Sequence, residues 1–79
     1  MKWCICDVYK GSLDVYPYNS KEEALAEAEK RWSSLEDYEK LDRGSFTVEL
    51  LNVGEDGEYI EDENGNADTK TYELAKEFR

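Results

Sequence analysis

The pattern of apolar and polar positions predicts three strands in the first two thirds of the chain. Residues 2–9 are rich in β-branched and aromatic side chains, and a Lys-Gly-Ser turn signal separates them from a short strand at residues 13–16. Because this connection is so tight, we expect an antiparallel hairpin. Pro17 has no N–H to donate and is expected to help end the second strand. In residues 45–53 apolar side chains alternate with polar ones, which predicts a half-buried third strand.

The clearest predicted helix follows Ser20. The Ser20 hydroxyl can accept a hydrogen bond from the backbone N–H of Glu23, whose side chain can reach back to the Ser20 N–H, as in a capping box. Apolar residues then recur at three- and four-residue steps and form one stripe: Leu25, Ala28, Trp32 and Leu35. We therefore predict a helix over residues 21–34.

A second, shorter helix is expected directly after the first. Ser33 and Ser34 are suitable caps, the helix is expected to reach about Leu41, and Gly44 is placed to terminate it. Pairs of opposite charge four residues apart are expected to stabilise both helices. These pairs are Glu27 with Arg31, Glu36 with Lys40 and Glu39 with Arg43.

The last third of the chain predicts a turn, a short strand, a loop and a helix. The turn covers residues 54–57, the strand lies around Tyr59 and Ile60, and residues 62–68 are rich in turn-forming residues. Asp68 or Thr69 is then expected to cap a C-terminal helix. The apolar residues on one side of that helix would be Tyr72, Leu74, Ala75 and Phe78.

This order, ββα(α)ββα, predicts an α+β fold. We expect residues 1–79 to form a single domain, with a three- or four-stranded, mainly antiparallel sheet and the helices packed on one face. The predicted core consists of Trp3, Ile5, Val15, Leu25, Ala28, Trp32, Leu35, Phe46, Val48, Leu50, Ala75 and Phe78.

The charge balance limits the classes of partner. Twenty acidic residues against ten basic ones give a net charge of −10. Direct binding to nucleic acid or to an anionic membrane is therefore not expected, because both need an excess of Lys and Arg. Basic surfaces of other proteins are the expected partners, and the alternative is that the charge only keeps a small protein soluble. With no signal peptide or membrane span evident in the sequence, we expect a cytoplasmic protein with reduced cysteines.

The first helix carries a resemblance to a known group of proteins. The shared pattern is an aromatic residue, a capping Ser or Thr, Lys-Glu-Glu-Ala, and then a Trp, a Leu and a Glu-Lys pair, represented here by residues 18–28, Trp32, Leu35, Glu39 and Lys40. It resembles small acidic proteins of Gram-positive bacteria and their mobile elements. The sequence departs at Glu36, where a Thr usually follows the Leu. The resemblance covers about residues 18–40, implies a stand-alone domain and carries no activity with it.

Cys4 and Cys6 are the first candidates for chemistry. They share one face of the first predicted strand, and we expect them to pack in the core rather than act in redox chemistry. A zinc site would need four ligands, but the chain has no histidine and no further cysteine. A disulfide between residues two apart on an extended strand has poor geometry.

Neither a calcium loop nor a catalytic constellation can be assembled from the sequence. If Gly65 is the sixth residue of an EF-hand loop, Ile60 and Thr71 occupy positions that require oxygen-rich ligands. Weak cation binding at Asp62, Glu63 and Asp68 stays open. The chain has no histidine to act as a base and no glycine-rich phosphate loop. We therefore assign no catalytic residue, cofactor or metal, and expect a protein that is not an enzyme.

The strongest candidate for function is an acidic segment. Eight carboxylates and no Lys or Arg lie between residues 49 and 68: Glu49, Glu55, Asp56, Glu58, Glu61, Asp62, Glu63 and Asp68. We expect this segment to bind a basic protein surface, and a sharper hypothesis is a nucleic-acid mimic that inhibits a nuclease or a repressor. The alternative is a solvated turn. Two other classes remain: a homodimer that pairs through a sheet edge or through exposed aromatics such as Tyr16 and Tyr18, and a weak ion or small-molecule sensor.

Overall fold

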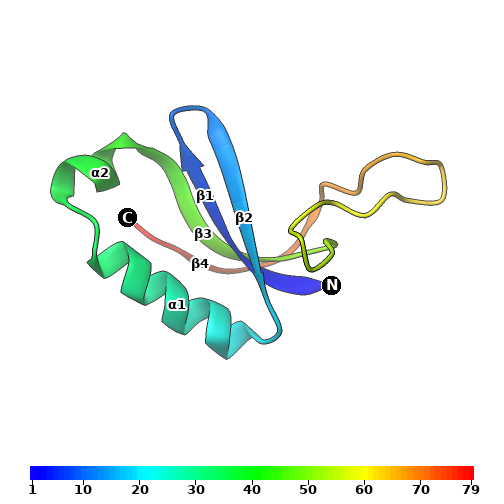
Figure 1. Cartoon of the computed structure of the whole chain (residues 1–79), viewed down its shortest axis with the longest axis horizontal. Helices are drawn as coiled ribbons and strands as arrows, with labels where there is room; N and C mark the ends of the chain where they lie inside the picture. Colours follow the sequence, from blue (N-terminus) through cyan, green and yellow to red (C-terminus); the bar gives the residue numbers. More distant parts are fainter.

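The computed structural model describes all 79 residues, which form four strands and two helices (Figure 1). In chain order these are β1 (Lys2–Tyr9), β2 (Ser12–Tyr18), α1 (Lys21–Ser33), α2 (Asp37–Asp42), β3 (Arg43–Leu51) and β4 (Thr71–Glu77). The strands form one sheet with the order β2-β1-β3-β4, and every neighbouring pair is antiparallel. The α+β fold, the antiparallel sheet and the placement of the helices on one face confirm the prediction.

α1 begins where its cap predicts. Ser20 has extended backbone angles, and its hydroxyl accepts a hydrogen bond from the Glu23 N–H at 3.1 Å. At the other end the Ser34 hydroxyl donates to the carbonyl of Lys30 at 2.9 Å. The helix therefore ends one residue before the predicted boundary, and Ser34 closes it instead of opening the next one.

One face of the sheet packs against α1 and forms what we call the helix-side cluster. Its buried members are Ile5, Ala24, Ala28, Phe46, Val48 and Phe78. Trp32 of α1 packs at its end, where the ring centroids of Trp32, Phe46 and Phe78 lie 5.4–5.8 Å apart. Most of the predicted core is found here, because the apolar stripe of α1 faces the odd-numbered residues of β1. Ala24 also belongs to it, although it was not among the predicted core residues.

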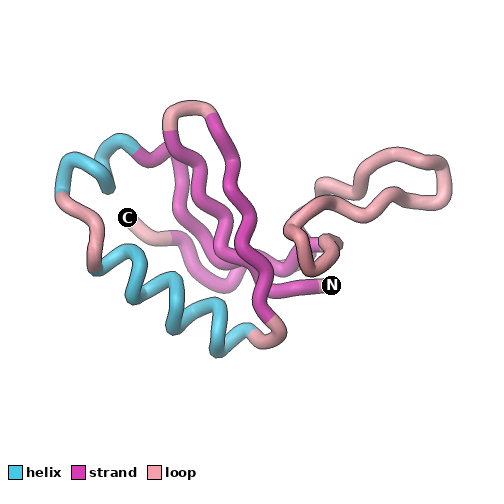
Figure 2. Tube along the Cα trace, in the orientation of Figure 1, coloured by secondary structure: helices cyan, strands magenta, loops and turns pink.

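A long excursion, the acidic arm (residues 52–70), joins β3 to β4. It leaves the sheet, extends away from both helices and returns, as the yellow and orange segment of Figure 1 shows. Figure 2 draws nearly all of it as loop, because its only strand-like pairings are the isolated bridges Val53–Tyr59 and Glu61–Ala67. The predicted strand around Tyr59 is thus reduced to a single bridge.

The first part of the arm folds back over the face of the sheet opposite α1 and closes a second core, the arm-side cluster. Its buried members are Cys4, Cys6, Leu51 and Val53, with Val15 and Tyr59 partly buried against them. The expectation that the two cysteines pack in the core is confirmed.

The predicted C-terminal helix is wrong, because residues 71–77 form β4. Asp68 does not cap a helix, and Tyr72 and Leu74 lie partly exposed to solvent on an edge strand. Without β4, the backbone N–H and C=O groups on the outer edge of β3 would have no hydrogen-bond partners. The free energy gained when this segment pairs with β3 outweighs its weak helical pattern. Only Ala75 and Phe78 pack against the helix-side cluster as expected.

Several local predictions also need correction. Pro17 lies inside β2, which accommodates it because β2 is an edge strand with one unpaired side. α2 begins after Glu36, whose backbone N–H donates to the Glu39 carboxylate at 3.1 Å. Gly44 belongs to β3 and does not terminate α2. None of the three predicted charge pairs on the helices is among the ion pairs of the structure.

Candidate functional site

The acidic arm concentrates the negative charge of the molecule. Its 19 residues contain seven acidic side chains and one basic one, Lys70, which lies at the end next to β4. About a quarter of the chain therefore carries six of the ten net negative charges. No side chain of the arm takes part in an ion pair of the structure.

The arm is folded by its own backbone hydrogen bonds. The Ile60 N–H donates to the carbonyl of Asn52, and the Asp68 N–H donates to the carbonyl of Ile60, both at 3.0 Å. Nearer the tip, the Asp62 N–H donates to the carbonyl of Asn66 at 2.7 Å. These bonds join the outgoing and returning halves, so the arm has a defined course although it contains no regular strand.

Two aspartates shape the turns of the arm. Asp56 Oδ1 accepts the N–H of Glu58 at 3.0 Å, and Asp62 Oδ1 accepts the N–H groups of Asn64 and Asn66 at 2.9 and 3.0 Å. Such short-range bonds from an Asp carboxylate to following N–H groups are typical of Asx turns. One oxygen of each carboxylate is therefore used internally.

Asp68 fixes the end of the arm next to β4. It accepts hydrogen bonds from the Tyr72 hydroxyl, from the Lys70 N–H at 3.2 Å and from the Asn52 side-chain amide at 3.2 Å. The bond from Tyr72 is the main cause that lowers the pKa of Asp68 below its ordinary value, and it raises the pKa of Tyr72. Asp68 is thus a positioning residue of the arm.

The four glutamates of the arm have no such role. The side chains of Glu55, Glu58, Glu61 and Glu63 are exposed and make no hydrogen bond or ion pair within the chain. They are the carboxylates that the arm offers to solvent. Within the arm, the structure therefore distinguishes aspartates that shape the backbone from glutamates whose carboxylates have no partner in the chain.

Glu49 is separated from the other predicted site residues. It lies on β3, half-buried, where it accepts hydrogen bonds from the hydroxyls of Thr47 and of Thr71, the latter at 2.6 Å. Its carboxylate lies near the arm-side cluster and helps to raise the pKa of Cys4 and Cys6. Its bonds link β3 to β4 and not to the arm.

The two cysteines are buried and protonated at neutral pH. Burial is the main cause that raises the pKa of Cys4 to about 11 and that of Cys6 to about 12. Since the thiolate is the reactive form of cysteine, neither residue is activated for nucleophilic chemistry. No group of three or more His, Cys, Asp or Glu side chains is arranged around a metal position.

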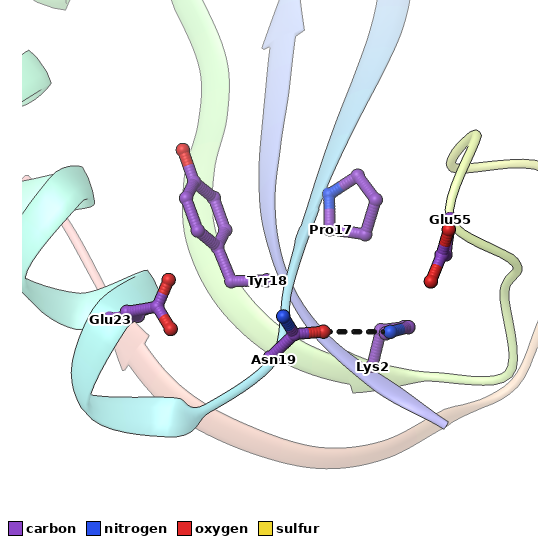
Figure 3. Close-up of a pocket in the computed structure, with 6 residues that line it drawn as sticks. All are labelled: Lys2, Pro17, Tyr18, Asn19, Glu23 and Glu55. Carbon is purple, nitrogen blue, oxygen red and sulfur yellow. Dashed lines mark hydrogen bonds between the residues drawn. The ribbon is translucent and has the colours of Figure 1, made fainter.

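A shallow polar depression lies where the arm meets the rest of the molecule (Figure 3). It has a volume of about 310 Å³ and is walled by Glu55 of the arm on one side and by Glu23 of α1 on the other. Lys2 lies between them and donates to the Asn19 side-chain oxygen at 2.9 Å. The two carboxylates thus face the depression from different elements, and no hydrogen bond connects them.

Known proteins give no further guide to the site. Comparison with protein-family models, curated proteins and solved structures found no match. Neither helix has the length and apolar composition that a bilayer crossing requires. The functional argument therefore depends on the geometry of the arm.

Proposed function

We propose that this protein is a binding module whose acidic arm docks on a cationic surface of another protein. The observation that carries the proposal is the state of the four glutamates. They are exposed on a folded projection and have no cationic partner, although the chain contains ten Lys and Arg residues.

The internal bonds of the arm support this role. A binding segment that is already ordered loses less conformational entropy on association than a flexible tail with the same charge. The bonds of Asp56, Asp62 and Asp68 provide that order here. Concentrated charge on one projection also steers the approach of a cationic partner over about a Debye length.

A groove rich in Lys and Arg is the class of surface that fits such an arm. Proteins that bind nucleic acid present such grooves to phosphate, and carboxylates spaced along a ribbon offer them comparable negative charge. We place this interaction in a reducing cytoplasm, where Cys4 and Cys6 stay thiols.

The test compares two variants of equal net charge. The arm variant carries Gln at positions 55, 58, 61 and 63. The matched control neutralises four exposed carboxylates of the folded body that make no side-chain hydrogen bond or ion pair: Asp14→Asn, Glu22→Gln, Asp37→Asn and Asp42→Asn. Both have a net charge of −6, so only the position of the lost charge differs.

Fluorescence anisotropy with a labelled Arg-rich peptide measures the effect at low salt. We expect the arm variant to bind about tenfold more weakly than the control, because four exposed charge contacts of about 0.2–1 kcal/mol each are lost. Binding by the unmodified protein should fall steeply near 0.3 M salt, roughly where exposed pairs are screened. Equal weakening in both variants would show that net charge alone is responsible and would refute a role for the arm.

A further inference from the structure

A second concave surface lies on the helix side of the sheet, between the C-terminal half of α1 and the β1–β2 hairpin. It is a groove of about 410 Å³. Its apolar lining comes from three different elements: Tyr16 of β2, Leu35 after α1, and Phe46 of β3. Two arginines, Arg31 and Arg43, line the same groove and are held in contrasting ways.

Arg43 shows how a fixed guanidinium is satisfied here. It lies over the ring of Tyr9, 4.4 Å from the ring centroid. Its Nε and Nη2 donate to the two carboxylate oxygens of Asp7 at 3.2 and 3.3 Å, which is a fork-to-fork arrangement. Its Nη1 donates to the carbonyl of Glu39 at 3.2 Å. Each nitrogen of Arg43 therefore has a partner.

Arg31 has the same support but lacks the carboxylate. It lies 4.2 Å from the ring centroid of Tyr16, and its only hydrogen bond runs from Nη2 to the Tyr18 hydroxyl at 3.4 Å. Glu27, one turn earlier on α1, makes no ion pair with it, although both residues line the groove. Most of the five donors of this guanidinium are thus unused, in a protein with twice as many carboxylates as cations.

The charge in the groove limits what can occupy this position. Lys30, Arg31 and Arg43 face the two carboxylates of Asp7 and Glu27, which leaves one excess positive charge. One singly charged anion would balance it. A doubly charged phosphate would meet repulsion from both carboxylates. A half-buried guanidinium stacked on an aromatic ring is well suited to bind a carboxylate through two parallel hydrogen bonds.

From this arrangement we propose that the groove binds a small organic carboxylate. The carboxylate forks on Arg31 as Asp7 does on Arg43, and its apolar body lies against Tyr16, Leu35 and Phe46. This site is independent of the acidic arm, so either proposal can fail without the other.

The test uses the full chain and three probes: benzoate, its neutral isostere benzamide, and inorganic phosphate. Nitrogen-15 NMR spectra follow the signals of Arg31 and the backbone of Tyr16 and Phe46 during each titration. We expect saturable shifts with benzoate at millimolar concentrations and binding of benzamide at least about tenfold weaker, because the charge-assisted fork is lost. The arm variant described above should bind benzoate as the unmodified protein does.

Substitutions in the groove sharpen the test. Arg31→Gln should abolish the benzoate shifts, and Arg31→Lys should leave binding about tenfold weakened, since an ammonium cannot form the planar fork. Glu27→Gln removes a repelling carboxylate from a partly buried helix position and should tighten binding about twofold to fivefold. Lys21→Gln removes one positive charge, as Arg31→Gln does, but from the other end of α1; it is the control for Arg31→Gln and should have no effect.

Three results would overturn the proposal. These are the absence of saturable shifts with benzoate, equal affinity for benzamide, and tighter binding of phosphate than of benzoate. Unchanged affinity in both Arg31→Gln and Glu27→Gln would do the same, because Glu27→Gln leaves every packed residue in place and should fold normally.

Discussion

The two faces of the sheet are closed by different means. α1 covers one face with a regular apolar stripe, and the helix-side cluster is built from residues of β1, β3, α1 and the segment after β4. The other face is closed by the beginning of the acidic arm, which has almost no regular secondary structure and contributes Val53 and Tyr59 to the arm-side cluster.

Because of this difference, we expect the helix-side cluster to stabilise the whole domain and the arm-side cluster to hold the arm in position. Removing a residue from the helix-side cluster should destabilise the whole domain. Val53 and Tyr59 bracket the turn that carries Glu55, Asp56 and Glu58, so removing packing there should first loosen the charged segment. Packing on the arm-side face and presentation of charge are therefore linked.

The largest effect should come from the aromatic centre of the helix-side cluster. Phe46→Ala is expected to lower the free energy of unfolding by about 3–5 kcal/mol, because it leaves a cavity beside Trp32 and Phe78. Val53→Ala removes less buried surface and should cost about 2 kcal/mol. Urea unfolding measures both values. A larger loss of unfolding free energy in Val53→Ala than in Phe46→Ala would contradict the expectation that the helix-side cluster contributes most to the stability of the domain.

Between pH 8 and 10, alkaline pH should act mainly through the two thiols of the arm-side cluster. The pKa values of Cys4 and Cys6 are raised from 9.0 to about 11 and about 12. Both thiols are protonated in either state below pH 9, but above it the unfolded chain ionises first. Stability should therefore fall between pH 9 and 12, with about 3 kcal/mol lost by pH 10. In the double variant Cys4→Ala, Cys6→Ala the fall in urea midpoint between pH 8 and 10 should be much smaller, and an unchanged fall would contradict this origin.

The smallest expected effects come from two glycines of the arm. Comparing them distinguishes the contact of the arm with β2 from the local conformation of its backbone. Gly57 and Gly65 both have φ of 80°, but a Cβ at Gly57 would lie 2.7 Å from the carbonyl oxygen of Val15, whereas a Cβ at Gly65 meets nothing within 4 Å. Gly65→Ala should cost about 1 kcal/mol from backbone strain alone. Gly57→Ala should cost about 2 kcal/mol and lift the first turn from β2.

Hydrogen exchange of the arm amides reports this difference, since faster exchange indicates local opening. Faster exchange near Tyr59 in Gly57→Ala but not in Gly65→Ala is the expected pattern. Equal exchange in the two variants would mean that the arm is not held by its contact with β2.

Local signals made the first half of the fold predictable from the sequence. The Ser20 cap and the stripe of α1 depend on residues within one or two helical turns, and the hairpin depends on a tight turn between two strands. The same signals fail for β4, where shifts in register against β3 interrupt the two-residue period. The apolar residues Tyr72, Ala75 and Phe78 are also three residues apart, which is a spacing typical of a helix.

The two candidate sites also differ in how far they can be predicted from the sequence. The acidic residues of the arm can be read directly from the sequence, but the use of Asp56, Asp62 and Asp68 as internal acceptors depends on the folded turns. The groove could not be predicted at all. It requires Arg31 to lie over Tyr16, two residues from different elements, and the sequence predicted a pair with Glu27 instead.

The projecting arm has a practical consequence for measurements of size. The molecule measures 42 × 27 × 19 Å and has a radius of gyration of 12.8 Å, whereas a compact chain of this length would have one of about 11.5 Å. Its hydrodynamic radius is correspondingly large, so a monomer should elute from a gel-filtration column ahead of globular standards of 9.2 kDa. Early elution would therefore not by itself indicate a dimer, and the mass should be determined by light scattering.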